Sequence, residues 1–310
     1  MPKSPLALTR REAITLLSAL IPTALLAGCG GGGSGSSGST DSGVNVYLAL
    51  GDSYAYGYST QTDTPSGFGD QGYVKPFADW LAGRLSSGRP AVRNLAIPGE
   101  TTTSFLRTAN GPPVSEYNLR YADSGGSFAH APGQGSLLAI TAADIAGRGQ
   151  HPVAITLQIG GNNLLDLVTD PAFLAANDTQ RQALIDAAFA TIDADYTAIL
   201  LKVRAAAPSA PLFLVGYPDP FAGLEAGNPL AGISTPTIQR LNTLIAAHAA
   251  ADTRGAFVDI YTPFLGHETA YTLITLQDPA GSGIPDFHPS AVGYGIIADQ
   301  LIIAATGRIP

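Results

Sequence analysis

The chain has 310 residues, 45% of them hydrophobic, so it carries enough apolar material for one large globular domain or two small ones. It has 16 Lys and Arg residues against 24 Asp and Glu residues, which gives a formal net charge of -8 and an isoelectric point near 4.9. This acidic balance argues against a surface that follows nucleic-acid phosphates, so we expect no nucleic-acid partner.

The first 28 residues have the composition of a targeting segment. An arginine pair at residues 10–11 precedes an apolar stretch that is too short, and too interrupted by Pro22, for a membrane span. The stretch ends in LAGC at Cys29, the only cysteine of the chain. LAGC resembles the lipobox of bacterial lipoproteins, and the arginine pair resembles a twin-arginine export signal. The resemblance implies that Cys29 becomes lipidated and that the protein is an exported, membrane-anchored lipoprotein of the cell envelope. An ordinary secretory signal with a chance cysteine is the alternative.

Two further regions follow the predicted signal peptide of residues 1–28. Residues 29–43 are rich in Gly and Ser, cannot bury a core and are expected to form a flexible tether. From 44 to 310, apolar strand-like segments alternate with amphipathic helical segments, the pattern of a parallel α/β sheet in one domain. The predicted strands are 45–50, 92–96, 153–159, 212–216 and 256–260. The predicted helices are 74–86, 136–147, 180–206, 234–252 and 290–305.

Three long stretches fit neither a strand nor a helix: 59–73, 109–134 and 264–286. Loops of this length are uncommon in a compact domain unless they build a binding site. The aromatic residues of the first two stretches are expected to form part of a wall for an acyl chain or a sugar ring. These residues include Phe68, Tyr73, Tyr117 and Tyr121.

Four short polar blocks lie where a predicted strand ends or where the last helix begins. GDS follows the first strand, NLAIPGET the second and GGNN the third, and DFHPS precedes the last helix. Open α/β sheets bind their ligands at the carboxyl edge, where these blocks lie. A serine hydroxyl is a poor nucleophile without an adjacent base, which a histidine can supply. The blocks contain a candidate serine, Ser53, and a candidate base, His288.

These blocks, in this order, resemble those of the SGNH or GDSL-type serine hydrolases over nearly all of residues 44–305. The resemblance implies a three-layer α/β/α sandwich with a central, mainly parallel five-stranded sheet of flavodoxin-like type. It also implies an esterase with Ser53 as nucleophile and His288 as base. The oxyanion hole would comprise the backbone N–H groups of Ser53 and Gly99 and the side chain of Asn162.

Other catalytic designs have less support in the sequence. The nucleophile elbow of α/β-hydrolases, Gly-x-Ser-x-Gly, does not occur, because no serine has glycine at both flanking positions. No pair of histidines, pair of cysteines or acidic cluster has the spacing of metal ligands, so no metal and no cofactor are expected. Asn163 stands where the family more often has Asp, and we interpret it as part of the scaffold.

The acid partner of His288 is the point where the sequence departs from the family pattern. The family has an aspartate three residues before the histidine, but Pro285 stands there, and Asp286 lies only two residues before His288. Residues two apart in an extended segment project to the same side, so we predict that Asp286 orients the imidazole. Asp278, or a backbone carbonyl of residues 283–285, could fill this role instead.

The leading hypothesis is therefore an enzyme that hydrolyses carboxylic esters through an acyl intermediate on Ser53. Acyl esters, lipid esters and acetyl groups on polysaccharides all remain open as substrates. A lipid-anchored protein that binds a carbohydrate or small ligand without catalysis is the second hypothesis, and a hydrolase fold that has lost its activity is the third. We expect a monomer whose partners are its substrate and, through Cys29, a membrane.

Overall fold

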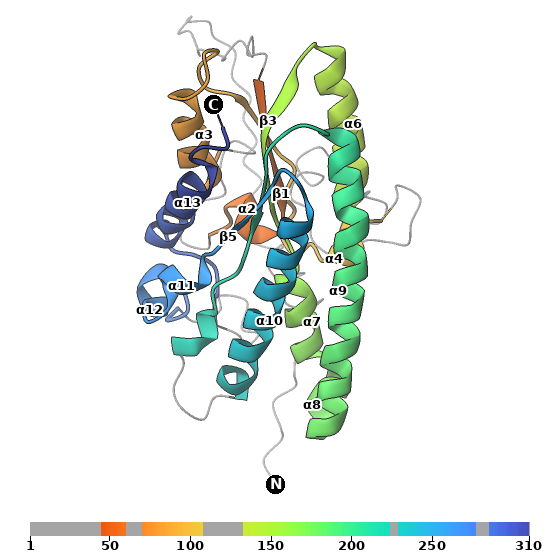
Figure 1. The fold of residues 1–310 in the computed structure, drawn as a ribbon. Helices are drawn as coiled ribbons and strands as arrows, with labels where there is room; N and C mark the ends of the chain where they lie inside the picture. The colour runs from red at the N-terminus through yellow and green to blue at the C-terminus, as the bar shows by residue number, and fades with distance from the viewer. Residues whose placement is uncertain (1–44, 60–69, 108–132, 224–228, 277–284, 310) are drawn as a thin grey trace, which may run out of the picture.

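The computed structural model describes residues 45–59, 70–107, 133–223, 229–276 and 285–309 (Figure 1). The predicted signal peptide, the tether and Cys29 lie outside the described residues. So do three of the four aromatic residues expected to form a substrate wall, Phe68, Tyr117 and Tyr121.

Five parallel strands form the central sheet, in the order β2-β1-β3-β4-β5. This is the flavodoxin-like order, in which the chain winds outward from the middle of the sheet in both directions. The predicted α/β fold is confirmed, and all five strands are parallel. The strands are β1 (Asn45–Gly51), β2 (Ala91–Asn94), β3 (His151–Gln158), β4 (Leu212–Val215) and β5 (Gly255–Val258).

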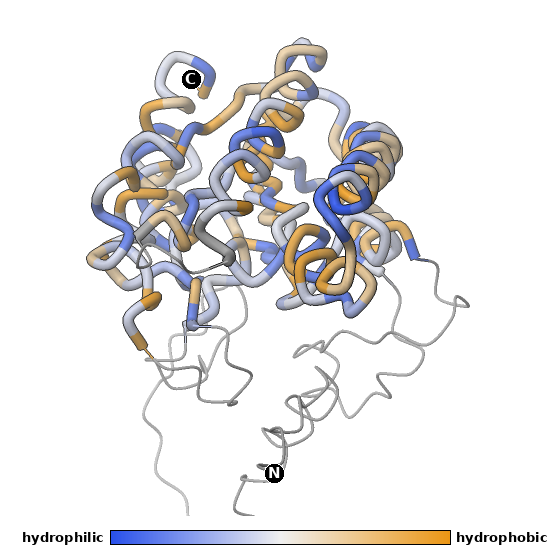
Figure 2. The backbone as a smooth tube through the Cα atoms, turned by 90° about the horizontal axis from the view of Figure 1, so that it is seen from below, coloured by the Kyte–Doolittle hydropathy of each residue, from blue (hydrophilic) through white to orange (hydrophobic). Residues whose placement is uncertain are grey.

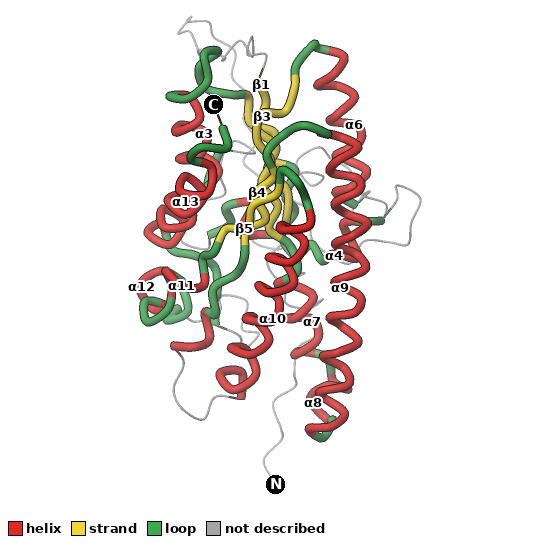
Figure 3. The backbone as a smooth tube through the Cα atoms, in the orientation of Figure 1, coloured by secondary structure: helices red, strands yellow, loops and turns green. Residues whose placement is uncertain are grey.

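Helices cover both faces of the sheet, as Figures 1 and 3 show. One face carries α3 (Val74–Ala82) and α13 (Ala291–Ala305), which pack against each other. The other face carries α6 (Gln134–Gly147), α9 (Asp178–Ala206) and α10 (Pro229–Ala251). All five predicted long helices are therefore confirmed, with ends that differ by a few residues.

Helix α9 illustrates how the sequence determines these elements. Asn177 and Gln180 form a capping box, in which each side chain accepts a hydrogen bond from the other's backbone N–H. Ile192, Tyr196 and Val203, which recur at helical spacing along α9, are fully buried. Figure 2 shows hydrophobic and hydrophilic residues alternating along such helices, as expected when one helix face lies on a sheet.

Short helices that the sequence analysis did not predict occupy several of the loops. They are α2 (Ser53–Tyr56), α4 (Thr102–Phe105), α7 (Gly161–Thr169), α8 (Pro171–Ala175), η3 (Pro220–Gly223), α11 (Tyr261–Phe264) and α12 (Glu268–Tyr271). Three of them, α2, α7 and η3, follow the carboxyl ends of β1, β3 and β4 and shape that edge of the sheet. Within the part of the chain that the structure describes, no helix is both long and apolar enough to cross a membrane.

Tyr73 requires a correction. It lies in the hydrophobic core, fully buried at the start of α3. The expectation that Tyr73 forms part of a substrate wall is therefore wrong. An aromatic residue at the end of a polar loop can instead pack into the core where the next helix begins.

Candidate active site

Ser53 is the first residue of α2, directly after β1 ends. Gly51 has a φ angle of 134°, and a Cβ atom there would lie 1.9 Å from the backbone oxygen of Gln158. Only glycine can make this close approach to β3. Asp52 then caps α2, since its side chain accepts a hydrogen bond from the backbone N–H of Tyr54 at 3.0 Å. The turn brings Ser53 to the carboxyl edge of the sheet, with 5% of its surface exposed.

His288 connects Ser53 to Asp286, although Ser53 and His288 are 235 residues apart in sequence. Nε2 of His288 lies 2.9 Å from Oγ of Ser53, and Nδ1 lies 2.8 Å from Oδ1 of Asp286. The same carboxylate oxygen accepts a hydrogen bond from the backbone N–H of His288 at 3.0 Å. In this arrangement Nδ1 can donate to Asp286 while Nε2 accepts from the Ser53 hydroxyl. The alternative acid, Asp278, lies outside the described residues.

Aromatic rings fix the His288 imidazole in place. The ring of Phe287 stacks on it at a centroid distance of 4.7 Å, and Tyr58 packs against it at the same distance. The hydroxyl of Tyr54, on α2, donates a hydrogen bond to the backbone oxygen of Phe287 at 2.6 Å. The segment that carries His288 is thus held directly by the helix that carries Ser53.

Asn162 lies near the start of α7, after the end of β3. Its Nδ2 donates a hydrogen bond to the backbone oxygen of Glu100 at 3.0 Å, and Asn162 is 6% exposed. Gly99 precedes Glu100 in a turn after β2, with a φ angle of 81° that favours glycine. The structure therefore brings three of the predicted blocks, those of Ser53, Gly99 and Asn162, to one edge of the sheet.

Asn163 makes scaffold contacts on the neighbouring helix. Its side-chain oxygen accepts a hydrogen bond from the backbone N–H of Thr102, and its side-chain nitrogen donates to the Thr102 hydroxyl, each at 3.0 Å. Asn163 thereby links α7 to α4.

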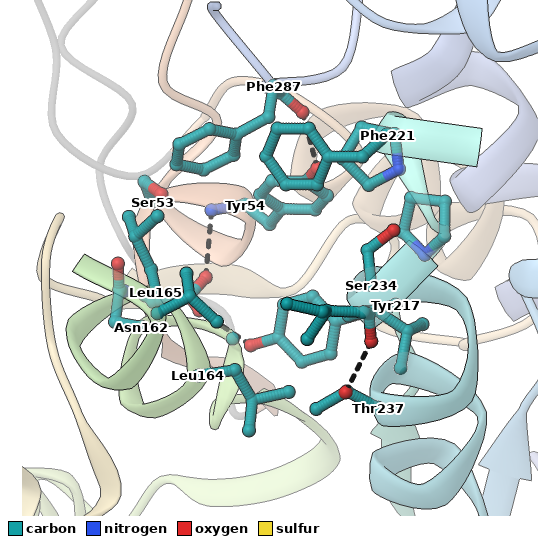
Figure 4. Close-up of a pocket in the computed structure, with 17 residues that line it drawn as sticks. Ser53, Tyr54, Asn162, Leu164, Leu165, Tyr217, Phe221, Ser234, Thr237 and Phe287 are labelled. Carbon is teal, nitrogen blue, oxygen red and sulfur yellow. Dashed lines mark hydrogen bonds between the residues drawn. The ribbon is translucent and has the colours of Figure 1, made fainter. Parts of the chain in front are cut away.

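A pocket opens on Ser53 and Asn162 (Figure 4). Apolar side chains from α7, from the segment after β4 and from α10 form most of its wall. They include Leu164, Leu165, Val168, Pro220, Phe221, Ile233 and Ile238. In Figure 4, Ser53 and Asn162 lie on one side of the pocket, and Tyr217 and Thr237 lie on the other.

The sequence profile of the GDSL-like lipase/acylhydrolase family matches residues 49–296, a span that contains all the blocks described above. The chain belongs to this family. The predicted family and enzyme class are confirmed: the protein is a carboxylic ester hydrolase of the SGNH/GDSL type. Membership in a family of hydrolases favours the enzyme over the alternative of a binding protein without catalysis.

Solved structures share the fold of this GDSL-family enzyme. A lipase, Lip_vut3, from a goat rumen metagenome is 19% identical, with a TM-score of 0.56 over 86% of this chain and 99% of the other. Phospholipase A1 from Streptomyces albidoflavus is 24% identical and an extracellular lipase from Streptomyces rimosus is 23% identical. Both have a TM-score of 0.51 over 84% of this chain and 99% of their own. At these identities the similarity supports the fold. No curated protein sequence matches the chain.

The surroundings of Asp52 in this GDSL-family site were not predicted from the sequence. The carboxyl group of Asp52 is buried and lies 2.5 Å from the hydroxyl of Tyr217, which follows β4. Loss of solvent around the carboxylate raises the pKa of Asp52 to about 7, against the lowering effect of the hydrogen bonds from Tyr217 and Tyr54. No pattern in the sequence links two residues that are 165 positions apart.

The apolar wall that α7 contributes to the pocket was not predicted from the sequence. A usable signal was present in the run after GGNN, where Leu164, Leu165 and Val168 recur at helical spacing. Such a stripe at the carboxyl edge of a sheet could have been interpreted as one side of a pocket.

Proposed function

We propose that this enzyme hydrolyses carboxylic esters whose acyl group is an extended hydrocarbon chain, through an acyl intermediate on Ser53. The apolar wall of the pocket that opens on Ser53 and Asn162 supports this proposal. An acetyl group would leave most of that wall in contact with water, whereas a longer chain gains free energy with each methylene that it buries.

In the proposed mechanism, His288 accepts the proton of the Ser53 hydroxyl while Oγ attacks the carbonyl carbon of the ester. Asp286 keeps the imidazole in the required tautomer and stabilises the imidazolium that forms. The tetrahedral oxyanion accepts hydrogen bonds from the backbone N–H groups of Ser53 and Gly99 and from Nδ2 of Asn162. His288 then protonates the leaving alkoxide, and a water molecule releases the acid by the same steps.

An ester series tests the choice of acyl chain. With p-nitrophenyl esters from acetate to dodecanoate, we expect kcat/KM to rise several-fold with each early methylene and then level off as the pocket fills. Ser53→Ala should abolish both turnover and labelling by a fluorophosphonate probe. A flat series, or a preference for acetate, would reject the acyl-chain proposal while leaving the esterase mechanism intact.

A matched pair of variants in α10 tests whether the pocket determines the preference for the length of the acyl chain. Thr237 lines the pocket, and Thr243 lies on the exposed face of the same helix. Both hydroxyls donate to the backbone oxygen four residues earlier, so the two substitutions remove the same kind of bond. Thr237→Phe should lower kcat/KM for octanoate about tenfold or more and spare acetate, whereas Thr243→Phe should change neither.

We also propose that residues 1–28 direct export, that Cys29 carries a lipid and that residues 29–43 tether the enzyme to an envelope membrane. The proposal rests on the sequence LAGC, the arginine pair before it and the Gly/Ser composition after it. A tether of this composition behaves as a flexible chain, which would let an anchored domain reach esters at or near the membrane surface.

A further inference from the structure

Glu100 is a buried carboxylate next to the turn that carries Gly99. It is 3% exposed, and Oε1 accepts a hydrogen bond from the hydroxyl of Ser104 at 2.6 Å. Oε2 lies 3.3 Å from Nε2 of Gln134. Burying a carboxylate is costly unless its hydrogen bonds compensate, so an apolar side chain would stabilise this turn at lower cost. The position of Glu100 therefore calls for a functional explanation.

Gln134, the first residue of α6, is fully buried and connects Glu100 to the strand that leads to Ser53. Its Oε1 accepts a hydrogen bond from the backbone N–H of Gly51 at 2.7 Å, and its Nε2 donates to the backbone oxygen of Gly51 at 2.8 Å. One side chain thus contacts the end of β1 and the carboxylate of Glu100.

The backbone oxygen of Glu100 accepts the hydrogen bond from Nδ2 of Asn162. A side-chain amide nitrogen has two hydrogens, so one remains to be donated to an oxyanion. If the amide were flipped, its oxygen would face the backbone oxygen of Glu100, and two acceptors would repel each other. The carbonyl of Glu100 therefore selects the orientation in which Asn162 can act as a donor.

We propose that Glu100 and Gln134 are positioning residues for the oxyanion hole. Neither lines the pocket, so neither is expected to touch the substrate. Gln134 holds the carboxylate of Glu100 against the end of β1. The side chain of Glu100 in turn fixes the main chain that presents the Gly99 N–H and orients Asn162. This inference rests on the proposed function, because the oxyanion hole is part of that mechanism.

The test compares Glu100→Ala with wild type and repeats the comparison in an Asn162→Ala background, using the full chain and one p-nitrophenyl ester. Rates are taken per folded molecule, with Tm measured for each variant. We expect kcat to fall about tenfold or more with KM nearly unchanged, because a donor that acts only in the transition state is misplaced. In the Asn162→Ala background the loss should be smaller, because the part that acts through Asn162 is already gone and only the part that acts through the Gly99 N–H remains.

Asp252→Ala is the control for a merely structural effect. Asp252 lies near the amino end of β5, away from the site, and its carboxylate pairs with Arg204 at 2.6 Å. Its loss should lower Tm and leave kcat unchanged. Glu100→Gln should recover part of the kcat lost in Glu100→Ala, because its amide oxygen can still accept from Ser104. If Glu100→Ala does not fold, Gln134→Met is tested instead, in the wild-type and the Asn162→Ala backgrounds.

Three outcomes overturn the inference: kcat unchanged in the folded variants, a change confined to KM, or the same loss in both backgrounds. If wild type hydrolyses no ester, or Ser53→Ala is equally active, the proposed function fails and takes this inference with it. If turnover depends on Ser53 but does not change in the Glu100 and Gln134 variants, this inference is wrong and the proposed function stands.

Discussion

The hydroxyl of Tyr217 donates a hydrogen bond to the buried carboxyl group of Asp52, one residue before Ser53, at 2.5 Å. Burial raises the pKa of Asp52 from 3.8 to about 7. The folded state therefore binds this proton more tightly than the unfolded state. The contribution of Asp52 to stability is full below about pH 4 and declines as the pH rises to about 7.

Asp52→Asn should remove this pH dependence while keeping the helix cap, because asparagine is also a favoured N-cap residue. Between pH 5 and 7, the unfolding free energy of wild type should fall by up to about 3 kcal/mol more than that of the variant. This corresponds to at most about 1.4 kcal/mol per pH unit for one titrating group. Urea denaturation of both proteins at pH 5, 6 and 7 measures the difference. Parallel pH profiles for the two proteins would show that Asp52 does not titrate in this range.

Asp286→Asn should lower kcat about a thousandfold at pH 8, because the amide can hold the imidazole in the wrong tautomer and cannot stabilise the imidazolium. Asp278→Asn, assayed with the same ester, should retain most of the rate. If Asp286→Asn stays active, the result for Asp278→Asn distinguishes a displaced carboxylate from a dyad assisted by a backbone carbonyl.

Asn162→Ala should lower kcat about a hundredfold or more with a small effect on KM, as expected when one oxyanion donor is lost. Asn163→Ala is the matched control, since its amide links α7 to α4 through Thr102. That variant should lower Tm and affect kcat far less. An effect of Asn162→Ala confined to KM would contradict its role as a donor.

Cys29→Ala should release the protein from the membrane fraction or block processing, because the lipid would have no attachment site. Fractionation of cells, followed by mass spectrometry of the N-terminus, measures both outcomes. A wild-type protein that partitions as soluble, without lipid on its N-terminus, would exclude the anchor.

The sequence was sufficient to predict the sheet and the long helices because their signals extend over many residues. Strands such as β1 and β4 are continuous apolar runs, and α9 carries a long apolar stripe. Gly51 and His288 could be assigned to the carboxyl edge because they stand in recognisable blocks at the ends of these elements. Short helices such as α2 and α11, of four residues each, give too little periodicity to be distinguished from loops.

Buried polar contacts could not be predicted in the same way. Gln134 was assigned to a loop, as its polar side chain suggests exposure, yet its burial depends on hydrogen bonds to Gly51, 83 positions away. Glu100 was seen only as part of a motif. Hydropathy cannot reveal a polar residue whose partners are backbone groups on a distant strand.

The bonds between Gln134 and Gly51 also complete the hydrogen bonding of the last peptide group of β1, beside the site. A regular continuation of β2 would pair with the last peptide groups of β1 and fill this corner with backbone. Here Gly51 gives its N–H to a side-chain amide, while its oxygen accepts from Ile97 as well as from Gln134. The chain after β2 is consequently free to leave the sheet and turn at Gly99. A single glutamine thus lets the chain after Ile97 turn away at Gly99 without leaving the N–H of Gly51 unpaired beside Ser53.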